Sequence, residues 1–505
     1  MWGKVWRAAI LVAALFIPSM AGAQDLTLTA REGGLSISGT LQGFDGEFYR
    51  IESVYGPLTI DASGVICDGP ACPDLTAPRA QIRIIGFAGV GEALLPGLFR
   101  AFADVRGLIY TQASGGDFGA TISDPETGKT LADISFMAAE PDAARGMLIN
   151  GAAELILSAA TEPGLGARVV AMDAMVPIVS PDNPLPEIST RDLARVLSGE
   201  VPNWAEVGGP DMPLVLHGLA PASAIQRALG ARLGREVAAS VLHGDIAALG
   251  DAVAADPWAI AMTVRAGVRR ARAIPLTDSC GFPLLATPLA VKAEDYPLSL
   301  PLYLITPKRR LPLMLREFLD FLALPQAQSA VAAAGWIDRQ PQRQPMTSDG
   351  LRLMNAIQGA GEETTLADLK RLVNAMDGAD RLSLTFRFQD GSNGLDAHSR
   401  DNLGDLARLI EAGVFRDTAI VLAGFSDGSG ASAANLDLSK TRADGIVTAL
   451  RALMPELPDG ALPQVMAFGE AMPMACDETS AGRRLNRRVE VWLRPSFKDT
   501  RPSEN

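Results

Sequence analysis

Two opposite charges stand out near the C-terminal end of this sequence, one in a glycine-rich turn and one on the helix predicted to follow it. Asp427 lies among Gly424, Gly428 and Gly430, and Arg442 follows the turn. A carboxylate and a guanidinium held close together suit a zwitterion, because the carboxylate accepts an ammonium group and the guanidinium binds a carboxylate in a bidentate pair. Alternatively, the two residues pair with each other or face water, as most surface charges do.

The surrounding pattern predicts the elements that would position these two charges. Residues Ala419–Ala423 form an apolar run without breakers, short enough for a buried strand. The glycines after it predict a turn. From Asn435 to Leu453, apolar residues recur at helical spacing. This strand, turn and helix would hold Asp427 and Arg442 a few ångströms apart.

The same stretch resembles the signature of the OmpA-like peptidoglycan-binding domain, which is G-H-T-D-x-x-G followed by N-x-x-L-S-x-x-R-A. Residues 424–430 read GFSDGSG, and the second block is present as Asn435, Leu438, Ser439, Arg442 and Ala443. The closing N-R-R-V-E of the family stands at residues 486–490, and the resemblance extends over residues 381–494. One departure is Phe425, where the family usually has His.

This resemblance implies a peptidoglycan-binding site. In the family the equivalents of Asp427 and Arg442 hold the diaminopimelate of the peptidoglycan stem peptide, and we assign Asn435 and Arg487 to the same site. Arg487 belongs to a basic cluster that also contains Arg483, Arg484 and Arg488. Two interpretations of the cluster stay open. It frames the peptidoglycan groove, with Arg487 nearest, or it is a solvated basic face.

A hydrolase motif overlaps the same turn. Residues 424–428 also fit G-x-S-x-G, the nucleophile elbow, and they follow a predicted strand as that motif requires. The elbow needs a histidine later in the chain than its serine. The three histidines are His217, His243 and His398, and all precede Ser426. We therefore expect no enzyme, no catalytic residues and no cofactor.

Composition limits the remaining classes of function. With 505 residues the chain is too long for one core, so we expect about three domains. A hydrophobic content of 48% and a charged content of 20% are ordinary for globular proteins. The formal net charge of −13 argues against nucleic acid as a partner, because nucleic-acid binding needs basic surface.

The first 23 residues have the pattern of a secretory signal peptide. Lys4 and Arg7 precede an apolar core over Ala8–Ile17, and Ala21-Gly22-Ala23 fits an A-x-A cleavage site. The apolar run is too short to span a bilayer. We therefore expect a mature chain without a transmembrane segment, exported to the periplasm and associated with peptidoglycan on the outer-membrane side of a Gram-negative envelope.

Four cysteines in an exported protein suggest disulfides. Cys67 and Cys72 flank a predicted turn and could close a small loop. Cys280 and Cys476 are then left to pair, although this bond would join two domains and stays open. The sequence lacks C-x-x-C, and three scattered histidines do not form a metal site.

The N-terminal two thirds of the chain divide into two patterns. Residues 24–78 contain short alternating runs between glycine turns, which predict a small β-domain. Residues 79–340 alternate strands with helical segments, which favours an α/β domain. A glycine-rich turn over residues 86–91 follows the first strand of this region and leads into a helix, so its amides could bind an anion or could simply form a tight turn.

The middle region resembles phosphate-binding proteins of the PstS type. The block from Asp182 to Leu185, continued by VPNWAEVGG at residues 201–209, is similar to the N-P…N-W-x-x-V-G-G block of that family. Later blocks at residues 296–303, 318–321 and 335–337 are also similar. The resemblance implies a two-lobed type II periplasmic binding fold, with a ligand in the cleft and closure as a hinge motion.

The departures from this family concern the ligand. Its hydroxyl-bearing first loop is replaced by Phe87 and Gly89, its Ser-Asp by Met137-Ala138, and its R-x-x-S-G-T loop by residues 217–223. A desolvated phosphate needs many donors. The candidate ligand-binding residues that remain are Gly89, Val90, Ser114, His217 and Ser223. Phosphate, another small anion, a different ligand or an empty scaffold for protein contacts all stay open.

The predicted fold is therefore a multidomain α/β and α+β protein. After the binding fold, residues 341–378 are expected to be a Pro/Gln-rich linker with short helices, where Thr365 and Asp368 form a capping box. The last domain, residues 379–497, begins with an alternating strand and is expected to have the βαβαββ order of the OmpA-like domain. We expect a non-enzymatic solute-binding protein anchored to peptidoglycan, or alternatively a structural envelope protein with a ligand-free binding domain.

Overall fold

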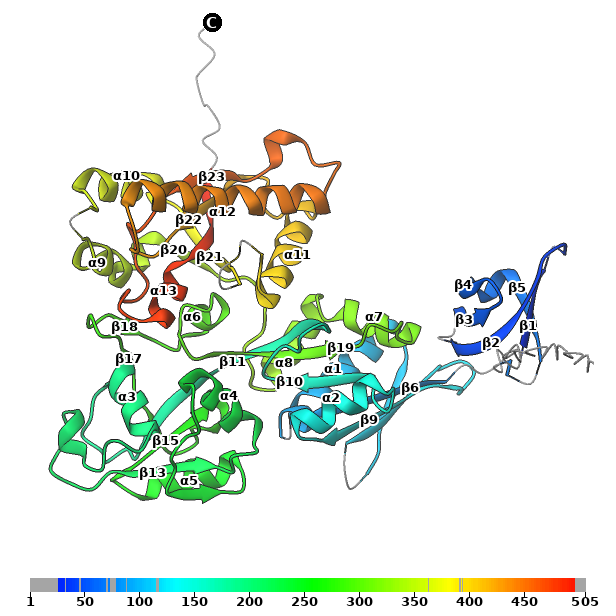
Figure 1. Cartoon of the computed structure of the whole chain (residues 1–505), viewed down its shortest axis with the longest axis horizontal. Helices are drawn as coiled ribbons and strands as arrows, with labels where there is room; N and C mark the ends of the chain where they lie inside the picture. Colours follow the sequence, from blue (N-terminus) through cyan, green and yellow to red (C-terminus); the bar gives the residue numbers. More distant parts are fainter. Residues whose placement is uncertain are drawn as a thin grey trace, which may run out of the picture. The chain divides into compact units, whose positions relative to one another are not determined.

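The computed structural model describes residues 26–495, apart from residues 32, 45–46, 70, 73–78, 88, 115–117, 362, 390–391 and 393 (Figure 1). The predicted signal peptide lies outside the described residues. The chain divides into two compact units. One holds the residues up to Ala80 together with Leu311–Met314, and the other holds Gln81–Arg310 and the rest from Leu315. We describe each unit by itself.

The first unit is a five-stranded antiparallel sheet in the order β4-β3-β2-β1-β5. Alternating residues of its strands, such as Leu26, Leu28, Tyr49 and Ile51, form a small core, which confirms the predicted β-domain. A disulfide joins Cys67, in the last strand, to Cys72, which follows that strand. The elements are β1 (Leu26–Ala30), β2 (Ser36–Phe44), β3 (Phe48–Ser53), β4 (Gly56–Asp61), η1 (Ala62–Gly64) and β5 (Val65–Asp68).

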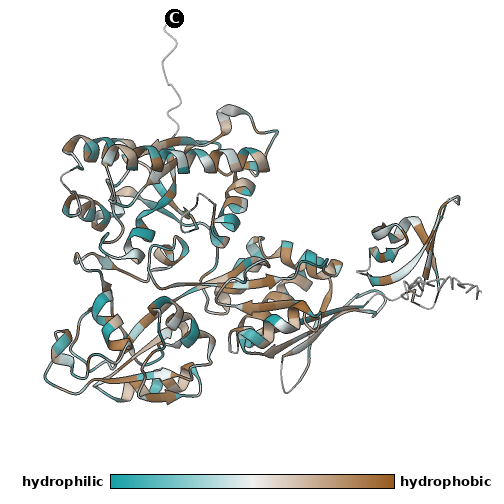
Figure 2. Ribbon diagram, in the orientation of Figure 1, coloured by the Kyte–Doolittle hydropathy of each residue, from teal (hydrophilic) through white to brown (hydrophobic). Residues whose placement is uncertain are grey.

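The second unit begins with an eleven-stranded sheet whose order is β14-β13-β15-β11-β19-β10-β6-β9-β8-β7, with β16 beside β11. The strands are β6 (Ala80–Gly86), β7 (Ile109–Gln112), β8 (Gly119–Ser123), β9 (Thr130–Ala138), β10 (Leu155–Ser158), β11 (Gly166–Val179), β13 (Val215–Leu219), β14 (Val241–His243), β15 (Ala259–Val264), β16 (Arg272–Ala273) and β19 (Ser299–Thr306). Apolar residues are concentrated on these strands, as Figure 2 shows, because helices cover the sheet.

The long strand β11 divides this sheet into two lobes. Its first part pairs with β19, and its second part pairs with β15. The lobe of β6 and β19 carries α1 (Val90–Arg106), α2 (Pro141–Ile149), α7 (Leu313–Phe321) and α8 (Pro325–Ala333). The lobe of β13 and β15 carries α3 (Thr190–Leu197), η2 (Trp204–Val207), α4 (Ala224–Leu233), α5 (Ile246–Ala255) and η3 (Arg265–Gly267). This confirms the two-lobed arrangement.

A short return segment follows the second lobe. β17 (Leu276–Thr277) pairs with β12 (Ile188–Ser189) and with β18 (Pro283–Leu284) in a three-stranded sheet. The helix α6 (Pro288–Lys292) then leads into β19. This segment supplies several of the residues of the middle region that contact the C-terminal domain, and the Val169 amide of β11 also donates a hydrogen bond to Asp401 at 2.6 Å.

The C-terminal domain is built on a five-stranded sheet in the order β20-β21-β24-β22-β23. Its elements are β20 (Arg343–Pro345), η4 (Met346–Ser348), α9 (Gly350–Gln358), α10 (Leu366–Met376), β21 (Asp380–Arg387), α11 (Ala397–Glu411), β22 (Thr418–Phe425), α12 (Ser432–Leu453), η5 (Asp459–Ala461), β23 (Gln464–Ala467), α13 (Ser480–Asn486) and β24 (Arg488–Pro495). The order from β21 onwards follows the predicted βαβαββ pattern, except that the short helix α13 lies between the last two strands, β23 and β24. The expected linker region differs, because Arg343–Pro345 joins the sheet beside β21.

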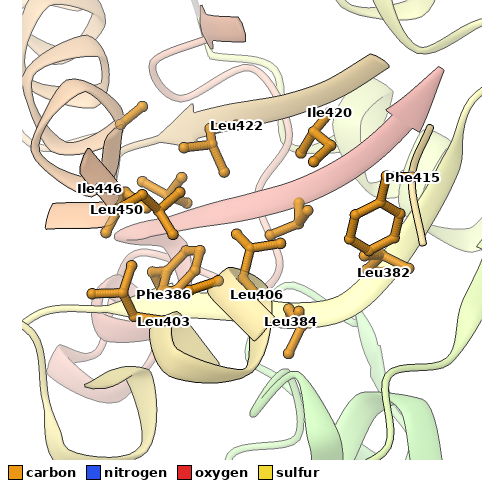
Figure 3. Packing of buried hydrophobic residues seen from close by; sticks show 14 of the residues in the cluster. Leu382, Leu384, Phe386, Leu403, Leu406, Phe415, Ile420, Leu422, Ile446 and Leu450 are labelled. Carbon is orange, nitrogen blue, oxygen red and sulfur yellow. The ribbon is translucent and has the colours of Figure 1, made fainter. Parts of the chain in front are cut away.

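One core of this domain lies between the sheet and the helices α11 and α12, and a second lies between the other face of the sheet and the helices α9 and α10. Figure 3 shows Phe386 of β21 and Leu422 of β22 facing Leu406 of α11 and Ile446 of α12. Each such buried side chain contributes about 1.5–3 kcal/mol to stability. The α10 helix begins with the predicted capping box, in which Thr365 and Asp368 bind each other's backbone amides.

Buried ion pairs connect this domain to the middle region of the same unit. Arg381 and Arg387 of β21 lie 2.6 and 3.1 Å from the carboxylate of Asp295, which follows α6. His398 of α11 lies 3.3 Å from the carboxylate of Glu294. All the side chains in these pairs except Glu294 are at least nine-tenths buried, and Glu294 is 19% exposed. Both faces of β21 are therefore buried.

Candidate functional site

The turn that carries Asp427 connects the end of β22 to the start of α12. Gly424 allows α12 to lie close to β22, because a Cβ there would meet the carbonyl oxygen of Ser439 at 2.1 Å. The Ser426 amide donates a hydrogen bond to the Gly469 carbonyl at 2.8 Å. The Gly469 amide in turn donates to Ser439 Oγ at 3.2 Å. These contacts hold residues 426–430, hereafter the Asp427 turn, against α12.

Asp427 forms an ion pair with Arg487. Its Oδ2 lies 3.1 Å from Nη1 of Arg487, and its Oδ1 accepts a hydrogen bond from the Ser429 amide at 3.1 Å. The side chain of Asp427 is 13% exposed and that of Arg487 is 27% exposed. The structure thus brings Asp427 and Arg487 together at a partly open position, where a competing ammonium group could reach the carboxylate.

Arg442 lies on α12, and its side chain is largely buried. Among the described residues, its Nε and Nη1 have no hydrogen-bond partner. Its Cζ lies 5.3 Å from the centroid of the Phe388 ring. Burial lowers the pKa of Arg442, and Arg487 lowers it further, whereas Asp427 raises it. Because unsatisfied buried donors cost free energy, this guanidinium has unused capacity for an anionic ligand.

Asn435, the fourth predicted peptidoglycan residue, contacts a different group. Its Nδ2 donates to Oε2 of Glu470 at 2.8 Å, and the residue is 5% exposed. Glu470 also accepts a hydrogen bond from Thr364 Oγ1 at 3.4 Å. Asn435 therefore ties the start of α12 to the loop after β23 and thereby supports the position of the helix that carries Arg442.

The basic cluster at the end of the chain separates into two parts. Arg488 is completely buried, where its Nε donates to Glu490 at 2.6 Å and its guanidinium covers the Phe425 ring at 4.2 Å. Arg487 instead lies beside Asp427. Phe425 also stacks on Phe468, with ring centroids 5.6 Å apart. The Phe425 departure thus lies in the core beside the site.

Sequence reasoning missed Asp477 and Phe388. Asp477 Oδ2 accepts a hydrogen bond from the Gly428 amide at 2.7 Å, directly under the Asp427 turn. Its Oδ1 accepts a hydrogen bond from Asn486 Nδ2 at 2.8 Å. The only sequence signal for Asp477 is its position next to Cys476, while Phe388 lies at the end of the predicted alternating strand.

The second candidate site lies where strands β6 and β9 end, in the lobe of β6; we call this place the edge. The Ala139 amide donates to the Gly86 carbonyl at 3.0 Å, so the segments that lead into α1 and α2 lie side by side. The Phe136 amide donates to the Phe118 carbonyl at 2.9 Å, which brings the β7–β8 hairpin to the same edge. Gly89 and Val90 begin α1, and Ser114 is an exposed residue of that hairpin.

Carboxylates dominate this edge. Glu92 Oε2 accepts a hydrogen bond from the Gly89 amide at 3.1 Å. The Gly89 amide, one of the donors predicted to bind an anion, is therefore already bonded to a side chain of α1. Arg227 of α4, in the other lobe, lies 3.8 Å from Glu140 and 3.5 Å from Asp142 at the start of α2. A bound anion would therefore meet acidic side chains here, with Arg227 as the nearby cation.

Ser223 and His217 have partners of their own. Ser223 is the N-cap of α4, and its Oγ accepts a hydrogen bond from the Gln226 amide at 3.3 Å. His217 is 7% exposed on β13, and its Nδ1 lies 3.0 Å from Nε2 of His243. Burial lowers the pKa of His217, and His243 lowers it further. Its Nε2 lies 4.0 Å from Asp256. No group of three or more metal-ligating side chains occurs within the described ranges.

Two known families match separate parts of the chain. Residues 387–487 match the OmpA family, and residues 143–326 match a PBP superfamily domain. Both resemblances predicted from the sequence are confirmed. The chain joins a PBP-like, PstS-type domain to a C-terminal OmpA domain. Both matched families are typically non-enzymatic.

Individual relatives cover parts of either domain. The chain is 44% identical over 50 residues to "Phosphate-binding protein PstS" of Borreliella burgdorferi, which is 10% of this chain and 18% of that protein. It is 30% identical over 108 residues to "Probable lipoprotein YiaD" of Escherichia coli, which is 21% of this chain and 47% of that protein. The chain thus spans less than half the length of each of these curated relatives.

A solved structure is similar to part of the chain. An ABC-type phosphate transport receptor from Vibrio cholerae is 17% identical, covers 51% of this chain and 99% of its own, and has a TM-score of 0.41. Separately, none of the helices in the described part of the chain has both the length and the apolar character needed to cross a membrane.

Proposed function

We propose that this chain is a non-enzymatic periplasmic protein whose OmpA domain tethers it to peptidoglycan and whose PBP-like domain keeps a cleft for a small anion such as phosphate. In the tether, Asp427 would accept the ammonium group of diaminopimelate and Arg442 would bind its carboxylate. The observation that carries this proposal is the buried guanidinium of Arg442, whose Nε and Nη1 lack partners among the described residues.

The proposed location is the periplasmic side of the outer membrane. The predicted signal peptide over residues 1–23 supports export. The match to the OmpA family and the likeness to a protein named as a lipoprotein support an envelope position. Peptidoglycan would then be the fixed partner, and the PBP-like domain would be held near the cell wall.

Soluble muropeptides test the tether directly. The full mature chain is titrated with a diaminopimelate-containing muropeptide and with a matched muropeptide that carries lysine at the same position. Lysine keeps the ammonium group but lacks the second carboxylate, which is the proposed partner of Arg442. We expect binding to the lysine form to be at least about tenfold weaker. Equal affinity for the two forms would contradict the assignment of Arg442.

For the PBP-like domain, the glycine turn before α1 and the neighbouring start of α2 support a small anion, since helix N-termini favour negative charge. A second candidate function, a ligand-free scaffold for protein contacts, is favoured by the Glu92 carboxylate on the Gly89 amide. The positions of Glu140 and Asp142 favour the same alternative, because like charges would repel an incoming anion.

Calorimetric titration of the full chain with inorganic phosphate, after phosphate-free preparation, separates these two functions. Micromolar binding with a melting shift of the size that mass action requires would support the solute-binding function. Absence of heat at millimolar phosphate would support the scaffold and exclude phosphate as the ligand. Neither result affects the peptidoglycan tether.

A further inference from the structure

A disulfide joins the PBP-like domain to the OmpA domain next to the Asp427 turn. Cys280 lies in the turn between β17 and β18, and Cys476 lies in the loop between β23 and α13. The Asp278 carboxylate supports the same connection, because its Oδ2 accepts a hydrogen bond from the Cys476 amide at 2.6 Å. Its Oδ1 accepts from the Cys280 and Phe282 amides at 3.0 and 2.7 Å. The return segment of the PBP-like domain thus contacts Cys476 through two interactions, the disulfide to Cys280 and the hydrogen bond to Asp278.

The residue after Cys476 is Asp477, which contacts the Asp427 turn of the proposed peptidoglycan site. Asp477 Oδ2 accepts the hydrogen bond from the Gly428 amide at 2.7 Å, and Gly428 directly follows Asp427. A Cβ on Gly428 would lie 2.8 Å from the same oxygen, so a larger residue there would force the Asp477 carboxylate to shift. A hydrogen bond from a backbone amide to a carboxylate is among the stronger ones in proteins. Asp477 can therefore fix the position and orientation of the Asp427 turn.

Asp477 also has supports within the OmpA domain. Its Oδ1 accepts from Asn486 Nδ2 at 2.8 Å, and its carbonyl accepts from Arg483 Nη1 at 2.6 Å. Asn486 Oδ1 accepts from the Met474 and Ala475 amides at 2.7 and 3.1 Å. These bonds would keep the loop folded without the disulfide. Loss of the disulfide should therefore loosen the Asp427 turn rather than unfold the domain.

We infer that Asp477 is a positioning residue of the peptidoglycan site and that the Cys280–Cys476 disulfide holds it in place. The PBP-like domain then contributes to peptidoglycan affinity without touching peptidoglycan. This inference rests on the proposed function of the OmpA domain. It extends that function, because it links affinity for the cell wall to an intact covalent bond between the two domains.

The test uses four forms of the full mature chain. They are the wild type, the double variant Cys280→Ser/Cys476→Ser, the variant Asp477→Asn, and the double variant Cys67→Ser/Cys72→Ser as a matched control. The control removes the other disulfide, which lies in the N-terminal sheet. For each form, the dissociation constant for a diaminopimelate-containing muropeptide and the hydrogen exchange of the Gly428 amide are measured.

We expect the Cys280/Cys476 variant and Asp477→Asn to bind about three- to tenfold more weakly and to exchange the Gly428 amide at least about tenfold faster. The control variant should match the wild type in both measurements. A Gly428 amide as protected without the Cys280–Cys476 disulfide as with it would overturn the inference, whatever the affinities are. If the wild type binds the muropeptide, variants that bind it with the same affinity as the wild type would also overturn the inference.

Failure of the proposed function gives a different result. If the wild type binds no muropeptide, the peptidoglycan assignment fails, and the link to affinity fails with it. Faster Gly428 exchange would still show that the disulfide positions the turn. If the Cys280→Ser/Cys476→Ser variant does not fold, the folded Cys67→Ser/Cys72→Ser variant is treated with a phosphine, which reduces its one remaining disulfide, and the same exchange measurement is made. The phosphine is oxidised to its oxide with the oxygen of a water molecule, and the two hydrogens of that water complete the two thiols formed from the S–S bond.

Discussion

Arg442 lies with its Cζ 5.3 Å from the centroid of the Phe388 ring, while Nε and Nη1 of the same guanidinium have no hydrogen-bond partner among the described residues. An aromatic face attracts a cation but satisfies none of its N–H groups. The arrangement therefore orients the guanidinium and leaves its donors for another group. The charge of Asp427 raises the pKa of Arg442, but Asp427 itself forms its ion pair with Arg487.

Substitution of Arg442 by Gln should separate binding from stability. We expect the affinity for a diaminopimelate-containing muropeptide to fall at least about tenfold, because the partner of the ligand carboxylate is lost. The free energy of unfolding should change by no more than about 1 kcal/mol, because the guanidinium forms few bonds in the folded protein. Titration and urea unfolding measure the two quantities.

Lys440→Gln is the matched control for this substitution. Lys440 lies on the same helix and pairs with Asp444 on the surface. Its replacement should leave both the affinity and the stability unchanged. An Arg442→Gln variant that binds the muropeptide as tightly as the control would contradict the role of Arg442 in the site.

The His398–Glu294 pair should make stability depend on pH. Burial, the largest single cause, lowers the pKa of His398, but the interactions with Glu294 and the charge of Asp396 together outweigh burial and raise that pKa. A raised pKa in the folded state contributes stability that is complete below the ordinary histidine pKa of about 6.5 and is lost as the pH rises through the folded value. The wild type should therefore lose stability above roughly pH 6.5.

The variant His398→Gln isolates this contribution. Other charges near the pair, including Asp396, Arg387 and Arg484, are present in both proteins, so the difference between wild type and variant reports His398. Urea unfolding at pH 5.5 and pH 9 should show a larger stability loss for the wild type than for His398→Gln. The pKa of Glu294 is lowered to about 2, so this carboxylate stays charged throughout the range. Parallel pH profiles would show that the pair is not charged.

Glu490 is the centre of a buried ion cluster in the OmpA domain. Its carboxylate lies 2.5 Å from Arg352, 2.6 Å from Arg488 and 3.4 Å from Arg381. It is completely buried and also accepts a hydrogen bond from Trp492 Nε1 at 2.9 Å. Glu490→Gln would leave the guanidinium groups without this countercharge. We expect a loss of about 3–5 kcal/mol in the free energy of unfolding.

Urea unfolding measures this loss, with Glu456→Gln as the control. Glu456 is an exposed residue after α12, so its neutralisation should change stability by less than about 0.5 kcal/mol. If Glu490→Gln were as mild as the control, the arginines would have to be satisfied by other groups. The result would then limit the role of the buried cluster in holding the domain together.

The sequence predicts the Asp427 turn well because the strand, the glycines and the helix that form it are consecutive. Local periodicity and turn residues are sufficient for such a unit. The contact between Asp477 and Gly428 is not predictable in this way, because the two residues are 49 positions apart and meet only when the sheet is complete. A single aspartate after a cysteine carries no periodic signal.

The strand β21 shows the same limit at the level of packing. Alternation identifies Leu382, Leu384 and Phe386 as its core face. It does not reveal that Arg381 and Arg387 on the other face are also buried, because their partner Asp295 belongs to another domain. The three-residue strand β20 was likewise hidden in a Pro/Gln-rich stretch, since its pairing depends on the neighbouring strand.

The substitution of Glu92 tests whether the start of α1 in the PBP-like domain can bind an anion. Its carboxylate accepts a hydrogen bond from the Gly89 amide, so it acts as an internal anion at the start of α1. Removal of this side chain in Glu92→Ala would free the amide and eliminate one negative charge from the start of α1. If the turn is a competent anion site, we expect phosphate to bind at least about tenfold more tightly to this variant than to the wild type.

Calorimetric titration with phosphate compares this variant with Glu126→Ala. Glu126 is an exposed residue between β8 and β9, so its removal changes net charge equally without freeing the Gly89 amide. Equal gains in the two variants would mean that general electrostatics, not the Gly89 amide, limits binding. No binding in either variant would show that Glu92 does not mask an anion site, and the scaffold function would then account better for the retained fold.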